Sequence, residues 1–204
     1  MNAHAYSEDQ LVEQPAIGLF ATLGWQTVSA LEETFGPSPP APLPEGEGRV
    51  WLGRETKSEV VLVERLHAAL GKFNPALPPE AISNAVDALT RDRSAMSLEA
   101  ANREVYRLLK EGIAVSVPDH EHGGQKTERL RVVDWQRPEN NDFLLVSQFS
   151  VTGALYTCRP DLVGFVNGLP WVVIELKKPG VPARAAFDEN LTHYKQQIPA
   201  LFWS

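Results

Sequence analysis

The pattern of apolar and polar residues divides the chain into a helical first part and a strand-rich second part. Apolar residues recur at helical spacing in four stretches: residues 8–23, 58–70, 79–89 and 97–109. This spacing predicts four helices. Ser7 and Ser97 are candidate N-caps, and Pro15 is expected to mark or bend the first turn of the first helix. Gly24 and Gly71 are expected to end the first and second helices.

From residue 113 onwards the apolar period changes to two, which predicts strands. The candidate strands are residues 113–117, 130–135 and 143–151, followed by a hairpin at 161–177. A last helix is expected from about residue 182 to 197. Helices, then a sheet, then a closing helix predict a mixed α/β domain. We expect a single domain over residues 1–204, with a helical portion at about 1–111 and a sheet-plus-helix core at about 112–204.

Residues 36–48 are too rich in proline and glycine for regular structure, so this stretch is predicted to be a mobile loop.

The predicted hairpin carries charged residues at the ends of its strands. Asp161 opens one apolar run, and Glu175 and Lys177 close the next, with Asn167-Gly168 between them. An Asn-Gly pair between two β-rich runs is typical of a hairpin turn. Side chains alternate between faces along a strand, so Glu175 and Lys177 point the same way. Carboxylates suit Mg²⁺, and a lysine adds a positive point charge, so these residues predict a metal-dependent site acting on phosphate.

The hairpin register tests this interpretation. A strict two-residue turn pairs Val166 with Leu169, which would place Asp161 and Glu175 on opposite faces. We therefore predict either a three-residue connection centred on Gly168 or a β-bulge that restores the phase.

Composition sets limits on function. The chain has 204 residues, 43% hydrophobic content and a net charge of −7. No apolar run approaches membrane-spanning length, and the polar, acidic start lacks the features of a signal peptide. We therefore expect no membrane association and a cytoplasmic location. The single cysteine, Cys158, fits a reducing compartment and is expected to be a small apolar filler.

The negative charge argues against a protein that grips DNA by itself, because phosphate contacts dominate DNA affinity. Other domains or subunits would supply most of the grip. Cationic residues nevertheless gather near the candidate site in the sequence: Arg159, Lys177, Lys178, Arg184 and Lys195.

An ordered series of motifs resembles the PD-(D/E)xK nuclease site of the restriction (R) subunit of type I restriction–modification enzymes. The series covers nearly the whole chain: Leu70-Gly71-Lys72-Phe73-Asn74-Pro75 with Leu77-Pro78, Asn140-Asn141-Asp142-Phe143 with Gln148-Phe149, Arg159-Pro160-Asp161 through Asn167-Gly168-Leu169-Pro170 to Glu175-Leu176-Lys177, and Tyr194-Lys195 with Ile198-Pro199 and Leu201-Phe202. The resemblance implies a restriction-endonuclease-like fold, a mixed sheet flanked by helices.

The resemblance also implies roles for individual residues. Asp161 and Glu175 would bind Mg²⁺, and Lys177 would orient or activate the attacking water. The family often carries a Gln-x-x-x-Tyr pattern on the following helix, where this chain has Asn190 and Tyr194. Two further residues are expected near the site: Glu13, the best match to an additional acid and metal ligand on the early helix, and Gln148 on the adjacent strand. For Gln148, hydrogen bonding inside the sheet is an equal alternative.

By this resemblance the protein would be a Mg²⁺-dependent endonuclease that cuts double-stranded DNA. It would be the cleavage module of a type I restriction enzyme, with methyltransferase and specificity subunits as partners. The chain contains no Gly-x-x-x-x-Gly-Lys-[Ser/Thr] loop, so the helicase-like motor is absent from it, and ATP would act only through that motor. The chain is then either an amino-terminal fragment or a standalone remnant. The alternative function is a catalytically silent module that docks onto the motor or methyltransferase subunits.

Two other groups are expected to lie outside the site. The cluster at residues 119–122 contains histidine and carboxylates, but its proline and glycine neighbours favour a solvated turn. His193 is expected to be a surface histidine.

Overall fold

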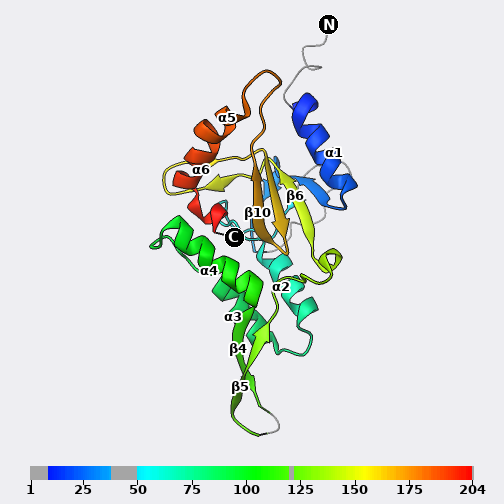
Figure 1. The fold of residues 1–204 in the computed structure, drawn as a ribbon, viewed down its shortest axis with the longest axis vertical. Helices are drawn as coiled ribbons and strands as arrows, with labels where there is room; N and C mark the ends of the chain where they lie inside the picture. The colour runs from blue at the N-terminus through cyan, green and yellow to red at the C-terminus, as the bar shows by residue number, and fades with distance from the viewer. Residues whose placement is uncertain (1–8, 38–49, 120–121, 204) are drawn as a thin grey trace.

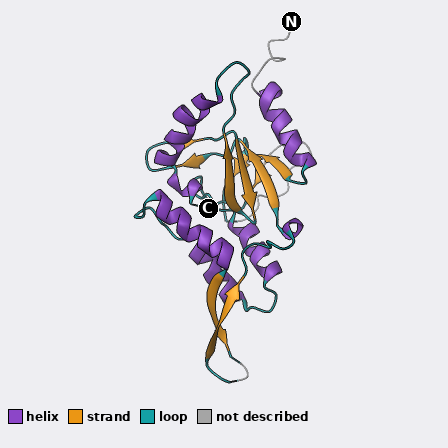
Figure 2. Cartoon of the chain, in the orientation of Figure 1, coloured by secondary structure: helices purple, strands orange, loops and turns teal. Residues whose placement is uncertain are grey.

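The computed structural model describes residues 9–37, 50–119 and 122–203. Its centre is a four-stranded sheet in the order β1-β6-β9-β10. The strands are β1 (Gln26–Ser29), β6 (Phe143–Ser147), β9 (Leu162–Val166) and β10 (Leu169–Ile174). β1 runs parallel to β6, and the other neighbours are antiparallel. A mixed sheet with helices around it confirms the predicted mixed α/β class (Figures 1 and 2).

The helices cover different parts of this sheet. The ribbon places α1 (Gln14–Thr22), which follows a π-turn at Asp9–Glu13, on one side of the sheet (Figure 1). The closing helix is a continuous segment of α5 (Ala183–Ala185), η4 (Ala186–Leu191) and α6 (Thr192–Gln197), and lies on the other side. Three helices lie towards one end of the sheet: α2 (Val63–Phe73), α3 (Pro79–Thr90) and α4 (Leu98–Glu111).

Short strand pairs and 3₁₀ turns complete the described part of the chain. The strand pairs are β2 (Glu33–Thr34) with β3 (Val50–Trp51), β4 (Ile113–Pro118) with β5 (Gln125–Leu130), and β7 (Val151–Thr152) with β8 (Thr157–Cys158). The 3₁₀ turns are η3 (Pro138–Asn140) and η5 (Pro199–Phe202). The described helices include none that is both long enough and apolar enough to cross a membrane.

Buried side chains form two hydrophobic clusters. The first joins α2, α3 and α4 to the β4–β5 hairpin, with residues such as Leu66, Val86 and Val115. The second joins the sheet to the closing helix, with residues such as Phe165 and Tyr194. The packing crosses the expected division near residue 111, because β1 pairs with β6 and the β4–β5 hairpin packs with the preceding helices.

The β9–β10 turn anchors the hairpin between the two clusters. Asn167 and Gly168 have φ values of 52° and 80°, which agrees with the structural role predicted for this pair. The buried Asn167 amide donates to the Val132 carbonyl at 3.1 Å, and the Leu62 N–H donates to the Gly168 carbonyl at 2.9 Å. A Cβ on Gly168 would lie 2.5 Å from the Leu62 carbonyl oxygen, so this end of the hairpin is packed directly against the start of α2.

The helix predicted at 58–70 begins five residues later than expected and ends three residues later. Tertiary contacts hold the segment before Val63 in a non-helical form of bends and a turn, since the Glu59 carbonyl accepts from Arg54 and the Leu62 N–H donates to the Gly168 carbonyl. Gly71 does not end the helix. The end comes at Asn74, whose side-chain amide donates to the Leu70 carbonyl at 2.8 Å.

The strand predicted at 130–135 is wrong. The strand that pairs with β4 is β5, at Gln125–Leu130, and most of its side chains are exposed, so it carries no apolar alternation. Backbone groups at 131–134 bond to asparagine side chains instead of a neighbouring strand: the Arg131 N–H donates to Asn74 and the Asp134 N–H to Asn141.

Two other differences concern the main sheet. The strand predicted at 143–151 stops at Ser147, because Gln148 turns into the left-handed region with φ of 58°. β1 was not predicted, because its four residues are mostly exposed and too few to show a period. Most of the proline-rich loop at 36–48 lies outside the described residues.

Candidate functional site

A β-bulge at Trp171 decides which face the charged residues share. Leu169 pairs with Val166 across a two-residue turn and Pro170 pairs with Phe165, but Val172 pairs with Gly164, which leaves Trp171 as an extra residue. The three-residue turn is therefore wrong, and the alternative prediction, a bulge that restores the phase, is confirmed. Ile174 pairs with Leu162 in the shifted register, so the next positions along both chains, Glu175 and Asp161, lie opposite each other.

Asp161 is held in place by the segment that directly follows β10. Its Oδ2 accepts a hydrogen bond from the Leu176 N–H at 2.7 Å, which ties the two strand ends together. Its own carbonyl accepts from the Gln148 N–H at 2.9 Å, which ties it to the end of β6. The carboxylate at 161 therefore stands where three chain segments meet.

Glu175 lies in a largely buried, negatively charged environment. Its side chain is 7% exposed, and the Tyr194 hydroxyl donates to its Oε2 at 3.2 Å. Burial raises the pKa of the Glu175 carboxyl, and the nearby negative charge of Asp161 raises it further, whereas Tyr194 and Lys177 oppose these effects. Burial also raises the pKa of the Tyr194 hydroxyl, which therefore stays protonated and able to donate.

Lys177 points to the same region. Its Nζ donates to Asn190 Oδ1 at 2.8 Å and lies 3.9 Å from Glu175 Oε1. Asn190 and Tyr194 both belong to the closing helix, and each contacts one residue of the hairpin end. The structure therefore brings together Asp161, Glu175, Lys177, Asn190 and Tyr194.

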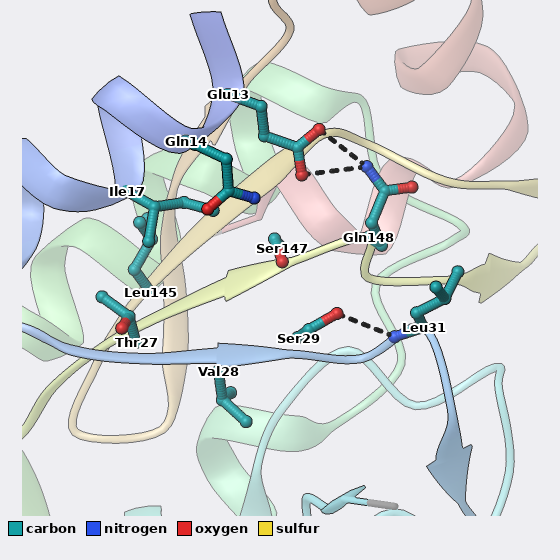
Figure 3. A pocket seen from close by; sticks show the side chains of 10 residues that line it. All are labelled: Glu13, Gln14, Ile17, Thr27, Val28, Ser29, Leu31, Leu145, Ser147 and Gln148. Carbon is teal, nitrogen blue, oxygen red and sulfur yellow. Dashed lines mark hydrogen bonds between the residues drawn. The ribbon is translucent and has the colours of Figure 1, made fainter. Parts of the chain in front are cut away.

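Glu13 and Gln148 form a neighbouring pair. Gln148 Nε2 lies 3.1 Å from Glu13 Oε1 and 3.2 Å from Oε2, at the mouth of a groove between α1 and the sheet (Figure 3). Gln148 thus bonds to Asp161 through its backbone and to Glu13 through its side chain. The expectation that Gln148 lies near the site and the alternative that it bonds within the sheet are both compatible with these contacts.

The carboxylates fit a site for one hard divalent cation. Within the described ranges, no group of three or more His, Cys, Asp and Glu side chains is arranged to hold a metal ion, so Glu13 does not join Asp161 and Glu175 in a closed cage. Mg²⁺ commonly uses one or two carboxylates and keeps several waters. Two neighbouring carboxylates, one of them with a raised pKa because of the other, match that requirement.

Other candidate residues are placed as follows. Cys158 is buried in the second cluster and burial raises the pKa of its thiol, as expected for a filler. Of the 119–122 cluster, His120 and Glu121 lie outside the described residues, and His122 Nδ1 lies 3.2 Å from Asp119. His193 is exposed, as expected.

The cations near the site lie at the surface. Arg159, Lys178, Arg184 and Lys195 are exposed, and Arg184 pairs with Asp188 at 3.0 Å.

Arg54 is a supporting residue that the sequence did not reveal. It is fully buried and pairs with Glu33, and its Nη1 donates to the Ser150 carbonyl at 3.1 Å. Its Cζ lies 3.9 Å from the centroid of the Phe149 ring. Arg54 therefore fixes the segment directly after Gln148. No sequence signal indicates this role, because its partners come from three separate segments.

These observations define a mixed α/β domain with two carboxylates and a lysine gathered at the open end of a β-hairpin. The family model for the type I restriction enzyme R protein N terminus matches residues 5–203, so the chain belongs to this family. The predicted resemblance to the amino-terminal part of the type I R subunit is thereby confirmed.

Curated relatives carry related names. The chain is 36% identical over 195 residues to the type I restriction enzyme HindI endonuclease subunit of Haemophilus influenzae, a match that covers 94% of this chain and 17% of the relative. It is 28% identical over 202 residues to the putative type I restriction enzyme MjaIXP endonuclease subunit of Methanocaldococcus jannaschii, covering 96% of this chain and 18% of the relative. The chain therefore spans less than a fifth of the length of these relatives.

Proposed function

We propose that this chain is a Mg²⁺-dependent endonuclease domain that hydrolyses DNA phosphodiester bonds. The observation that carries the proposal is the bulged register at Trp171, which sets Asp161 opposite Glu175 with Lys177 3.9 Å from Glu175. Membership of the family and the names of the relatives support a role in type I restriction. The assignment to the PD-(D/E)xK nucleases rests on the same three residues.

Each residue has a proposed task. Asp161 and Glu175 would hold Mg²⁺, which supplies a Lewis acid for the phosphate and a water with a lowered pKa. The backbone bond from Leu176 keeps Asp161 oriented, and the Tyr194 hydroxyl does the same for Glu175. Lys177, held by Asn190, presents a positive charge towards the reacting phosphate and its attacking water.

The proposed partners follow from the likeness to type I restriction enzymes, and the charge of the chain limits its own share of the DNA affinity. The substrate is double-stranded DNA, but a net charge of −7 leaves most of the DNA affinity to other parts of a restriction–modification complex. We propose that methyltransferase and specificity subunits supply sequence choice and grip. ATP would act through a helicase-like motor domain. We propose a cytoplasmic location for such a complex.

The direct test is cleavage of supercoiled DNA by the purified chain with Mg²⁺. We expect nicked or linear product from the wild type and a decrease of at least about 100-fold in Asp161→Ala and Lys177→Ala, because each removes a charge at the reacting phosphate. Equal amounts of product from all three proteins would overturn the catalytic assignment.

The acidic charge of the whole chain favours a second candidate, a docking module whose site is silent. Thermal unfolding during a Mg²⁺ titration separates the two. An ion that binds the native state raises the melting temperature by mass action, and that rise should be lost in Asp161→Ala if the site is real. A docking module without a cation site would show no rise in either protein.

A further inference from the structure

Gln148 adopts a backbone conformation that glutamine rarely takes. Within the described residues, two non-glycine residues have a positive φ, Gln148 at 58° and Asn167 at 52°. Asparagine tolerates this region because its short side chain bonds locally, whereas glutamine does not share that advantage. Strained residues of this kind persist where the surrounding structure holds them and often mark functional positions. The conformation therefore directs attention to what the side chain contacts.

The strained turn lets one residue join two elements. The Gln148 N–H donates to the Asp161 carbonyl at 2.9 Å, and the side-chain amide donates to Glu13 at 3.1 Å (Figure 3). A bond from a neutral amide to a carboxylate is charge-assisted and stronger than a bond between neutral groups. Gln148 thus connects the end of α1 with the strand that carries Asp161.

Helix α1 lies on the sheet with its side chains only partly covered. The helix contains no buried side chain, and Leu19 and Leu23 are 59% and 66% exposed. A groove of about 510 Å³ lies between the helix and the sheet, lined by residues that include Glu13, Ile17, Thr27 and Ser147 (Figure 3). Near its other end, Phe20 packs on Trp25 with ring centroids 5.2 Å apart. The Glu13–Gln148 contact therefore joins the exposed helix to the sheet at the end nearest the site.

The base of this contact is rigid. Phe149, the next residue, is fully buried against Phe165 and beneath the Arg54 guanidinium. Arg54 also binds the carbonyl of Ser150. A side chain that extends from such a fixed segment can position its partner.

From these contacts we infer that Gln148 is a positioning residue that latches α1, and with it the Glu13 carboxylate, to the end of the sheet where Asp161 lies. The inference rests on the proposed function in one respect: it takes that end of the sheet to be the cation site. Glu13, which the resemblance already suggests as an additional acid, would then lie beside the Asp161–Glu175 pair, where its negative charge strengthens the attraction for a cation without closing a three-carboxylate cage.

A charge-swap experiment on the full chain tests the latch. Gln148→Glu places two carboxylates against each other, and Glu13→Gln combined with Gln148→Glu restores one amide–carboxylate pair in reverse order. We expect hydrogen exchange of the α1 amides to accelerate about tenfold or more in Gln148→Glu, because a charge-assisted bond becomes a repulsion. The double variant should return to within about threefold of the wild type, since the bond is restored.

Thr27→Ala is the matched control, because it alters another residue of the same groove and leaves the Glu13–Gln148 pair intact. If the α1 amides exchange hydrogen at the same rate in Gln148→Glu as in the wild type, the latch is overturned. If exchange accelerates throughout the protein in Gln148→Glu, the double variant decides: restored protection of α1 supports the latch, and no restoration overturns it.

A second variant tests the link to the cation. Gln148→Asn keeps the amide and suits the positive φ, but is one methylene too short to hold Glu13. We expect the Mg²⁺ concentration that gives half of the thermal stabilisation to rise about threefold or more. An unchanged midpoint overturns the assignment of Glu13 to the cation's surroundings. If the wild type gains no stability from Mg²⁺, the cation site and the proposed function fail, while hydrogen exchange still decides the latch.

Discussion

At the residue scale, the ionisation of Glu175 is subject to opposing electrostatic effects. Its side chain is nearly buried beside Asp161, and both conditions disfavour its negative charge. The Tyr194 hydroxyl and the Lys177 ammonium compensate in part. A bound divalent cation would remove the remaining repulsion between the two carboxylates. This relief favours binding of the ion.

Tyr194→Phe should shift the pH dependence of cleavage. The Tyr194 hydrogen bond lowers the pKa of Glu175, so its removal raises that pKa. Because the proposed reaction needs ionised Glu175, the acidic limb of the pH–rate profile should move to higher pH, while activity well above the limb changes little. Cleavage rates measured from pH 5 to 9 check this. A limb that stays in place or moves to lower pH would contradict the role given to Tyr194.

Glu175→Gln should stabilise the metal-free protein near neutral pH. A carboxyl whose folded-state pKa is raised destabilises the fold when ionised, and this penalty is relieved as the pH falls through the folded pKa. The melting temperature of the variant in EDTA should therefore exceed that of the wild type at pH 7, by about 2–4 °C for each kcal/mol of repulsion removed.

The gain from Glu175→Gln should shrink towards acidic pH, where the wild-type carboxyl becomes neutral too, and should reverse when Mg²⁺ is added. Thermal scans at pH 5 and pH 7 are the measurement. A variant less stable than the wild type at pH 7 in EDTA would show that burial and Asp161 do not dominate at Glu175.

At the element scale, the hairpin is anchored at one end and carries the candidate site at the other. The turn is fixed by Asn167 and Gly168 against Val132 and Leu62, and the opposite end carries the charged residues. Trp171, between the two ends, sets their relative phase. Among the residues that the structure describes, none provides a hydrogen-bond partner for its buried indole nitrogen, so the bulge carries an energetic cost.

An insertion after the bulge should separate folding from cation binding. One alanine placed between Val172 and Val173 moves Glu175 one position along, out of register with Asp161 and onto the other face of the hairpin. We expect circular dichroism close to that of the wild type and loss of the thermal stabilisation by Mg²⁺. Deletion of Trp171 is the matched control, because it removes the bulge but leaves Glu175 opposite Asp161, so the stabilisation should be retained. An insertion variant that keeps the stabilisation would show that the register does not set the site.

The elements that the sequence predicted well are those with their own period or cap. The helix at 97–109 was found because Ser97 caps it, with its Oγ accepting from the Ala100 N–H at 3.2 Å. The start of α2 and the stretch 131–135 were misjudged because their backbone groups bond to distant residues, such as Arg54 and Asn141. Such partners leave no mark on local periodicity.

The candidate site was predictable for a different reason. The residues at 161, 175 and 177 lie at strand ends whose phase follows from simple alternation, so the need for a bulge could be stated in advance. Which residue would form it could not, because the position depends on packing of Trp171 against the first hydrophobic cluster. The contact between Glu13 and Gln148 joins residues 135 positions apart, so the local periodicity of the sequence could not predict it.

At the scale of the whole molecule, an acidic chain carries a small number of exposed cations beside its site. Arg159, Lys178 and Lys195 are exposed, whereas Arg184 is paired with Asp188. The structure therefore offers little positive charge for phosphate contacts near the site. This distribution fits a module that depends on partners to bring DNA to it.

DNA binding by the isolated chain should therefore be weak and only mildly dependent on salt. With about three phosphate contacts, the slope of log K against log salt should be about −3 or shallower. Fluorescence anisotropy measures this with a labelled duplex in the presence of Ca²⁺. The salt concentration is varied from about 50 to 200 mM. A steep slope, near −6 or beyond by the same relation, would show a basic surface that the described residues do not present.

The β4–β5 hairpin projects from the end of the molecule opposite the loop that follows β10 (Figure 1). Thr127 lies exposed on that hairpin, and the native thiol of Cys158 is buried and disinclined to ionise. A cysteine introduced at Thr127 would thus react selectively with a maleimide dye. Single-molecule fluorescence could then follow the arrival of this protein on DNA through a reporter attached far from the chemistry.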